Sequence, residues 1–275
     1  MTASDRDIDG VLALSQAVGW PHRREDWSLA LSLGHGILAE EEGRIIGCAM
    51  WWAYGDAFAT GGGIIVSPTL QGKGLGRALM AQLLAETGER SILLSSTEAG
   101  LRLYRSLGFE GIGTAHQHRA QIPATEGLTQ AECDKTVREA RAGDLPAMVQ
   151  IDRQAFGAER SRLIEEFNRV GTAAVIDRDG AIRGFAMCRQ FGFGYAVGPV
   201  VARTEDDARS LIGYFIKTTA GALLRVDITD GSGLGNWLTA QGLPEVDVET
   251  LMIRGHRSPV SGPDHAFGLA SRSFG

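Results

Sequence analysis

Short runs of mostly apolar residues recur along the first half of the chain, in a pattern typical of buried β-strands. Residues 37–40 and 45–52 form two such runs on either side of the turn Glu42-Gly43-Arg44, which predicts a hairpin. A third run, 59–66, ends in three consecutive β-branched residues, which indicates a buried strand. Ser67-Pro68 ends this strand, because proline has no N–H to donate to a sheet.

The other segments of this half have the spacing of helices or of short buried strands. Apolar residues recur every three or four positions between Leu75 and Leu84, as on one face of a helix. Gly108 marks the end of a later helix. In order, we expect a helix capped by Ser4 or Asp5, helices at 26–33, 75–84 and 97–107, and strands at 91–95 and 111–122.

The second half of the chain repeats motifs of the first. Asp179 to Met187 lines up with Glu42 to Met50, and Gly235 to Leu243 lines up with Leu101 to Phe109. A repeat of about half the chain length indicates a tandem duplication rather than a solenoid. The expected division is a first domain at 1–124, a polar linker at 125–135, a second domain at 136–256 and a loosely packed tail at 257–275.

Composition narrows the functional class. At about 150 residues per domain, 275 residues suggest two domains, and 44% hydrophobic with 22% charged residues is ordinary for a globular protein. A net charge of −6 argues against a nucleic-acid partner. No apolar run is long enough for a membrane span, no signal peptide is evident, and Cys48, Cys133 and Cys188 are too scattered for a disulfide framework or a zinc site. We therefore expect a cytoplasmic protein without a metal.

The stretch after the third strand has the features of an anion site. Gln71-Gly72-Lys73-Gly74-Leu75-Gly76 lies between that strand and the helix beginning near Leu75. The first N–H groups of a helix have no intrahelical partner, and glycines allow a phosphate to approach them closely. The loop fits neither the Walker pattern, because no Ser or Thr follows Lys73, nor the Rossmann pattern, because Arg77 replaces the last glycine.

This loop resembles the Gln/Arg-x-x-Gly-x-Gly/Ala motif of the GNAT superfamily of N-acetyltransferases. A second motif of that family follows at the expected distance, as Leu101 to Phe109. The resemblance implies an α/β (α+β) fold of two tandem GNAT-like domains, each a mixed, mostly antiparallel sheet flanked by helices. It also implies transfer of an acetyl group from acetyl-coenzyme A to an amine by direct displacement, with no metal.

The resemblance assigns roles to particular residues. The strand ending in Ile64, Ile65 and Val66 would pair with the pantetheine arm, and the N–H of Ile65 or Val66 would polarise the thioester. Tyr104 would donate a proton to the leaving thiolate as the catalytic residue. The remaining cofactor-binding residues would be Gln71, Gly72, Lys73, Gly74, Leu75, Gly76, Arg77 and Thr97, the last standing where the family often has Asn.

The second copy lacks these features. The segment that corresponds to the glycine loop carries Glu205, Asp206 and Asp207, which complement a helix N-terminus themselves and repel a pyrophosphate. Leu238 stands where the first copy has Tyr104. We expect a degenerate domain that is structural or that contributes to the acceptor pocket.

The acceptor and the general base stay open at this stage. Candidate bases are Glu40, Asp56, Glu98, His116 and His118, and a pocket for a small amine is expected among Trp20, His22, Trp27, Trp51, Trp52, Tyr54 and Phe58. The partner expected is a small-molecule amine, with neither nucleic acid nor membrane, and a homodimer is allowed for. Two alternatives are a non-catalytic acyl-CoA-binding sensor and a protein lysine or N-terminal acetyltransferase.

Overall fold

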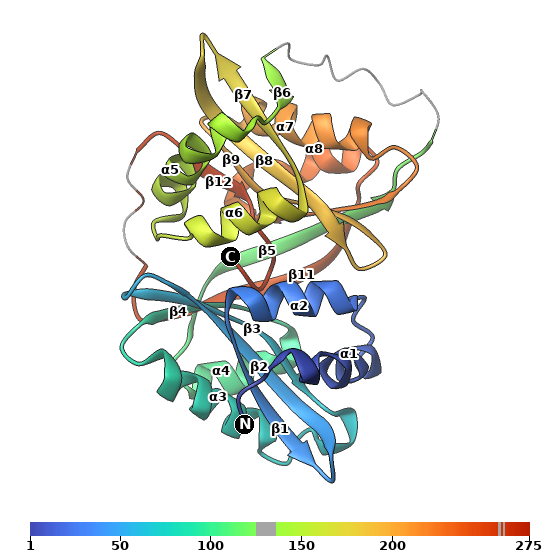
Figure 1. The fold of residues 1–275 in the computed structure, drawn as a ribbon, viewed down its shortest axis with the longest axis vertical. Helices are drawn as coiled ribbons and strands as arrows, with labels where there is room; N and C mark the ends of the chain where they lie inside the picture. Colours follow the sequence, from blue (N-terminus) through green and yellow to red (C-terminus); the bar gives the residue numbers. More distant parts are fainter. Residues whose placement is uncertain (125–135, 258–259, 261) are drawn as a thin grey trace.

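The computed structural model describes the whole chain except residues 125–135, 258–259 and 261 (Figure 1). The expected linker therefore lies outside the described residues. The first half contains α1 (Ile8–Ala17), α2 (Arg24–Leu33), β1 (His35–Glu41), β2 (Arg44–Tyr54), β3 (Phe58–Val66), α3 (Leu75–Thr87), β4 (Ser91–Ser96), α4 (Glu98–Ser106) and β5 (Glu110–Gln121).

The second half has the same order of elements after a short first strand, β6 (Val137–Glu139). They are α5 (Leu145–Phe156), α6 (Ser161–Val170), β7 (Gly171–Arg178), β8 (Ala181–Phe191), β9 (Gly194–Ala202), α7 (Glu205–Thr218), β10 (Leu223–Thr229), α8 (Gly235–Ala240), β11 (Glu245–Arg254) and β12 (His265–Gly268). The predicted hairpin turn is present and has a counterpart in the second half: Glu42 and Asp179 have φ of 49° and 56°, each followed by a glycine that also has positive φ. The two halves are thus built on one plan, as the repeat predicts.

The two halves exchange their last long strands. All strands form one sheet in the order β1-β2-β3-β4-β11-β5-β10-β12-β9-β8-β7-β6. β11, from the second half, pairs with β4 of the first, while β5, from the first half, pairs with β10 of the second. β5 and β11 also pair with each other and cross the middle of the molecule side by side (Figure 1). Residues 245–254 therefore complete the sheet of the first half, although the sequence groups them with the second.

Alternation along the strands builds cores on both faces of this sheet. On β2, Cys48, Met50 and Trp52 face the layer that contains α1 and α2, whereas Ala49 and Trp51 face α3. The first of these cores continues into the second half, where α5 and α6 pack over β7 and β8. The halves therefore share one hydrophobic core on this side.

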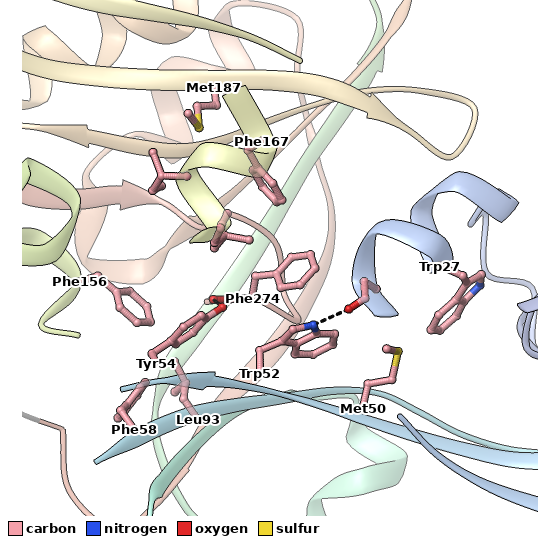
Figure 2. Packing of buried hydrophobic residues seen from close by; sticks show 14 of the residues in the cluster. Trp27, Met50, Trp52, Tyr54, Phe58, Leu93, Phe156, Phe167, Met187 and Phe274 are labelled. Carbon is pink, nitrogen blue, oxygen red and sulfur yellow. Dashed lines mark hydrogen bonds between the residues drawn. The ribbon is translucent and has the colours of Figure 1, made fainter. Parts of the chain in front are cut away.

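Residues 264–275 pack tightly, contrary to the loose tail expected at 257–275, of which 258–259 and 261 lie outside the described residues. The Phe274 ring lies 4.7 Å from the Trp52 ring and 5.6 Å from the Phe167 ring, between the two halves (Figure 2). The Tyr54 hydroxyl donates a hydrogen bond of 2.9 Å to the Phe274 carbonyl. An isolated aromatic in a Gly- and Ser-rich segment has no periodic signal, so its burial does not follow from the pattern.

The parallel strands at the centre of each half diverge partway along their length. β3 pairs with β4 only from Phe58 to Gly61, and its last residues have no partner on that edge among the described strands. β9 likewise pairs with β10 only from Tyr195 to Val197. In the second half, however, β12 fills the gap and pairs with Val200–Ala202 of β9.

Candidate active site

The glycine loop of the first half is exposed and conformationally suited to an anion. Gly72 and Gly74 have φ of 75° and 91°, which side chains other than glycine rarely adopt, and a Cβ added to either would meet nothing within 4 Å. Gly74 is the N-cap of α3, so the first N–H groups of a helix of 13 residues lie beside open space. The Lys73 side chain is exposed, and the Arg77 guanidinium donates to Ser106 Oγ on α4 at 2.7 Å.

The end of β3 presents backbone groups to the gap between β3 and β4. A bulge interrupts the β2–β3 register where Gly63 has φ of 58°. The Ser67 N–H donates to the Ile46 carbonyl on β2 at 2.9 Å. Since N–H groups alternate between the edges of a strand, the Ile65 N–H points towards β2 and the Val66 N–H points into the gap. The Ile65 side chain is buried in the core, and Ile64 lines the cleft described next.

A cleft of about 260 Å³ opens at this gap, between the two halves. Its floor includes Gly62, Gly63 and Ile64 of β3, and Thr97 and Tyr104 lie beside them. The second half contributes residues of β8, β10, β11 and the C-terminal segment: Arg189, Phe191, Arg225, Asp247, Glu249 and 271–274. The site is therefore composite, although the glycine loop belongs to the first half alone.

Tyr104 is buried against the cleft, with 7% of its surface exposed. Its ring packs edge-on to Phe109 at 5.9 Å. Burial raises the pKa of the Tyr104 hydroxyl, and the nearby carboxylate of Glu249 raises it further. The hydroxyl is therefore protonated at neutral pH and available as a donor.

Glu249 is a half-hidden carboxylate that the sequence pattern does not single out. Its side chain is 15% exposed, and Arg272 approaches it at 2.7 Å. Burial raises the pKa of Glu249, and the opposing charge of Arg272 reduces this rise without cancelling it. Glu249 escapes prediction because β11 lies in the second half of the sequence and reaches the first half only through strand exchange. The signal available is the pair Asp247 and Glu249, two carboxylates on one face of a strand.

None of the five bases proposed from the sequence lines this cleft. His116 binds Glu245 at 2.7 Å, and the buried His118 binds the Leu243 carbonyl at 2.8 Å, both away from the cleft. The cleft-lining residues likewise do not include Glu40, Asp56 or Glu98. His116 and His118 are two residues apart on β5, so both side chains lie on the face of the strand that is turned away from the cleft.

The expected aromatic pocket is divided between two places. Trp20, His22, Trp27 and Trp52 line the cleft, and the His22 ring stacks on Trp27 at 4.8 Å. Trp51, Tyr54 and Phe58 do not line it. Trp51 stacks on His35 at 4.3 Å, and Tyr54 and Phe58 pack on Phe156 in the shared core.

The second half has no comparable site among its described residues. Only two residues separate β9 from α7, and the cap of α7 is satisfied internally, because Thr204 Oγ1 accepts from the Asp207 N–H at 3.1 Å. Asp207 is buried and bonded to Arg178. Leu238, in the place of Tyr104, is fully buried in the core.

This arrangement defines the class of protein. A family model for the acetyltransferase (GNAT) domain matches residues 32–111, and a second model with the same description matches residues 148–268. Together the two matches cover most of the chain. The chain belongs to the GNAT N-acetyltransferase family and contains two tandem GNAT domains.

Individual proteins are similar to this chain over nearly its whole length. The chain is 25% identical over 279 residues to YitH of Bacillus subtilis, named an uncharacterized N-acetyltransferase, covering 98% of this chain and 96% of YitH. A putative acetyltransferase from Pyrococcus horikoshii superposes with a TM-score of 0.82 at 19% identity, over 100% of this chain and 95% of that chain. A tandem GNAT protein from the clavulanic acid biosynthesis pathway superposes with a TM-score of 0.63 at 14% identity, over 94% and 97%. The two structures share the fold.

Two further features bear on cofactors and location. Among the described residues, no group of three or more His, Cys, Asp or Glu side chains is arranged to hold a metal ion. In the same part of the chain, no helix has the length and apolarity needed to cross a membrane.

Proposed function

We propose that the protein is an acetyl-CoA-dependent N-acetyltransferase that acetylates a small-molecule amine by direct displacement at the first half. The observation that carries the proposal is the open gap between β3 and β4, with a glycine loop after β3 and with a protonated tyrosine and a half-buried carboxylate lining the adjoining cleft. The pyrophosphate would bind the N–H groups of the loop at the start of α3. The pantetheine amides would pair with the free edge of β3.

The reaction needs charge stabilisation at the thioester and two proton transfers. The Val66 N–H is the candidate donor to the thioester oxygen as the amine attacks the carbonyl carbon. Glu249 would accept the proton of the attacking amine, which its raised pKa suits, because a base works best when its pKa is near the working pH. Tyr104 would donate to the departing sulfur, so that coenzyme A leaves as the thiol.

The cleft favours a small acceptor over a protein substrate. Both halves and the C-terminal segment line it, and about 260 Å³ accommodates a compact molecule. A sensor that binds acyl-CoA without turnover would have the same cofactor site, so only an assay of acetyl transfer distinguishes it from an enzyme.

The test is release of coenzyme A thiol from acetyl-CoA in the presence of a panel of primary amines, with acetylated products identified by mass spectrometry. We expect amine-dependent thiol release. Val66→Pro removes the proposed donor N–H but no ladder bond to β2, and should lower kcat about 10²–10³-fold while acetyl-CoA still binds. Binding of acetyl-CoA without transfer to any amine would favour the sensor.

A further inference from the structure

Three arginines form a row across the strands that close the cleft. Arg189 on β8 lies opposite Ala196 on β9, Ala196 lies opposite Arg225 on β10, and Arg225 lies opposite Arg119 on β5. All three arginines line the cleft. Because neighbouring strands are about 4.8 Å apart, this row brings three guanidinium groups to one wall.

Arg189 is the exceptional member of the row. The residue is only 3% exposed, and its Nε has no hydrogen-bond partner. Within the described chain, no carboxylate lies within ion-pair distance of its guanidinium, which donates a long hydrogen bond of 3.4 Å to the Gln190 carbonyl. Burial lowers the pKa of Arg189 to about 10; the charge of Asp26 opposes this fall, and the charge of Arg225 adds to it. A buried, unpaired guanidinium is costly, and binding an anion offsets that cost.

Aromatic rings, rather than a directly paired carboxylate, pack against this guanidinium. The Arg189 guanidinium carbon lies 4.5 Å from the Phe167 ring centroid and 5.1 Å from that of Phe191. The His22 ring packs on the Phe191 ring at 5.0 Å, and its buried Nδ1 atom also has no hydrogen-bond partner. Arg225, by contrast, is paired with Asp227 at 2.7 Å. Two unpartnered polar atoms, on Arg189 and His22, thus lie at the same wall.

Three carboxylates gather around one arginine beyond this row: Asp227, Asp247 and Glu249 all lie within ion-pair distance of Arg272. Asp227 lies opposite Gln117, which lies opposite Asp247, in a row two residues, or about 6.6 Å, along the strands from the arginines. Glu249 lies two residues further along β11, towards Tyr104. Asp247 and Glu249, which share the single cation Arg272, therefore line the cleft on the side of Tyr104, and the row of arginines lines its other side.

We propose that the acceptor is an amine that also carries a carboxylate, and that Arg189 binds this carboxylate while the amine lies at Glu249. Arginine matches a carboxylate through two parallel hydrogen bonds, which fixes the orientation of the ligand. The proposal rests on the proposed function, because it names the substrate class of that site. It also makes a prediction about binding alone, which does not require turnover.

The binding test uses protein saturated with coenzyme A and a panel of N-acetyl amino acids, each paired with the N-acetyl amino acid amide of the same side chain. Calorimetry should find at least one acid that binds tenfold or more tightly than its amide. Arg189→Met should abolish this preference, and Arg189→Lys should retain part of it. Arg178→Met, which alters an arginine outside the cleft, should leave it unchanged. The affinity for coenzyme A serves as the check that each variant is folded.

The outcomes separate this proposal from the proposed function. Equal binding of acids and amides, no binding of either, or equal weakening of both by Arg189→Met would overturn the carboxylate site. Turnover of only neutral or purely cationic amines in the activity panel would also overturn it, while leaving the acetyltransferase proposal standing. Selective binding of acids without any turnover would support the carboxylate site and refute the enzyme.

Discussion

The two halves of this protein differ in what happens at the gap between their central parallel strands. In each, a pair of central parallel strands diverges and leaves backbone groups of one strand unpaired. The second half fills its gap with the chain's own β12, and its α7 begins with three acidic residues. The first half leaves its gap open and starts α3 with glycine. One plan thus gives a closed sheet in one half and an open gap in the other, so the gap, and not the fold alone, distinguishes the half in which we propose the site.

The strand exchange adds a second difference. Seven residues after Gly108 lies Ala115, and seven residues after Gly242 lies Glu249, so these two are equivalent positions of the repeat. They also face each other in the β5–β11 ladder. The duplication therefore yields one carboxylate, and Tyr104 of the first half lies near it, whereas the second half has Leu238 in place of that tyrosine.

The first prediction concerns the C-terminal segment. Its strand β12 fills the gap beside β9, and its Phe274 packs between the two halves. Phe274→Ala should lower the free energy of unfolding by about 3–5 kcal/mol, because it empties a site lined by Trp52 and Phe167. Denaturant unfolding measures this loss. Phe193→Ala is the matched control, since that ring is 83% exposed and its removal should cost under about 0.5 kcal/mol. Equal losses would mean that Phe274 does not hold the halves together.

The second prediction tests the carboxylate that only the open site has. Glu249→Gln should lower kcat about 10²–10³-fold and remove the acid limb of the pH–rate profile. In the unaltered protein, activity should fall as the pH drops through the pKa of Glu249, above the range of an ordinary glutamate because burial raises it. Glu245→Gln on the same strand, outside the cleft, should keep both rate and profile. A full acid limb in Glu249→Gln would assign the base elsewhere.

The third prediction concerns His22, whose pKa is lowered to about 4 by burial, with Arg225 and Arg189 contributing. Between pH 6.5 and about pH 4, the imidazole is protonated in the unfolded chain but neutral in the folded chain. His22 therefore contributes stability above pH 6.5 that is lost as the pH falls towards 4. The loss is about 3 kcal/mol. Unfolding free energies at about pH 7 and pH 4 should differ by about this much more in the unaltered protein than in His22→Phe. An identical pH dependence in the two would contradict the buried, neutral imidazole.

The smallest expected effect on kcat comes from removing the hydroxyl that would donate a proton to the leaving thiolate. Tyr104→Phe should lower kcat about 10–10²-fold with the affinity for acetyl-CoA unchanged, because only a proton donor is removed. Steady-state kinetics and calorimetry together provide the measurement. Leu238, at the equivalent position of the second half, supplies the control: Leu238→Met should leave kcat unaltered. A Tyr104→Phe variant with full activity would reduce the tyrosine to a packing role.

Local patterns in the sequence are enough to predict the order of elements and the repeat. Both hairpin turns are marked by a glycine after a polar residue, and the glycine loop is marked by its position between a β-branched run and an amphipathic helix. These features depend on residues that are neighbours in the chain. Together with the family resemblance, they predict that the loop, the β3 edge and Tyr104 belong to one site.

The rest depends on contacts between distant segments, which alternation does not encode. A strand pattern states which side chains share a face but not which strand will lie beside it. Glu249 and the arginine row therefore cannot be predicted from the sequence. For the same reason His116 and His118 are candidate bases in the sequence, although neither lines the cleft. The filling of the second gap by His265–Gly268 is hidden for the same reason, since four residues in a Gly- and Ser-rich segment carry no periodic signal.

In our proposal the first half, whose gap is open, binds the cofactor, and the second half, whose gap β12 fills, does not. Calorimetric titration of acetyl-CoA into the purified chain tests it most directly. We expect one site per chain, weakened a hundredfold or more by Gly74→Glu, which places a bulky anion at the N-cap of α3, and unaffected by Arg203→Glu at the corresponding loop of the second half. Two sites per chain, or no binding at all, would contradict it.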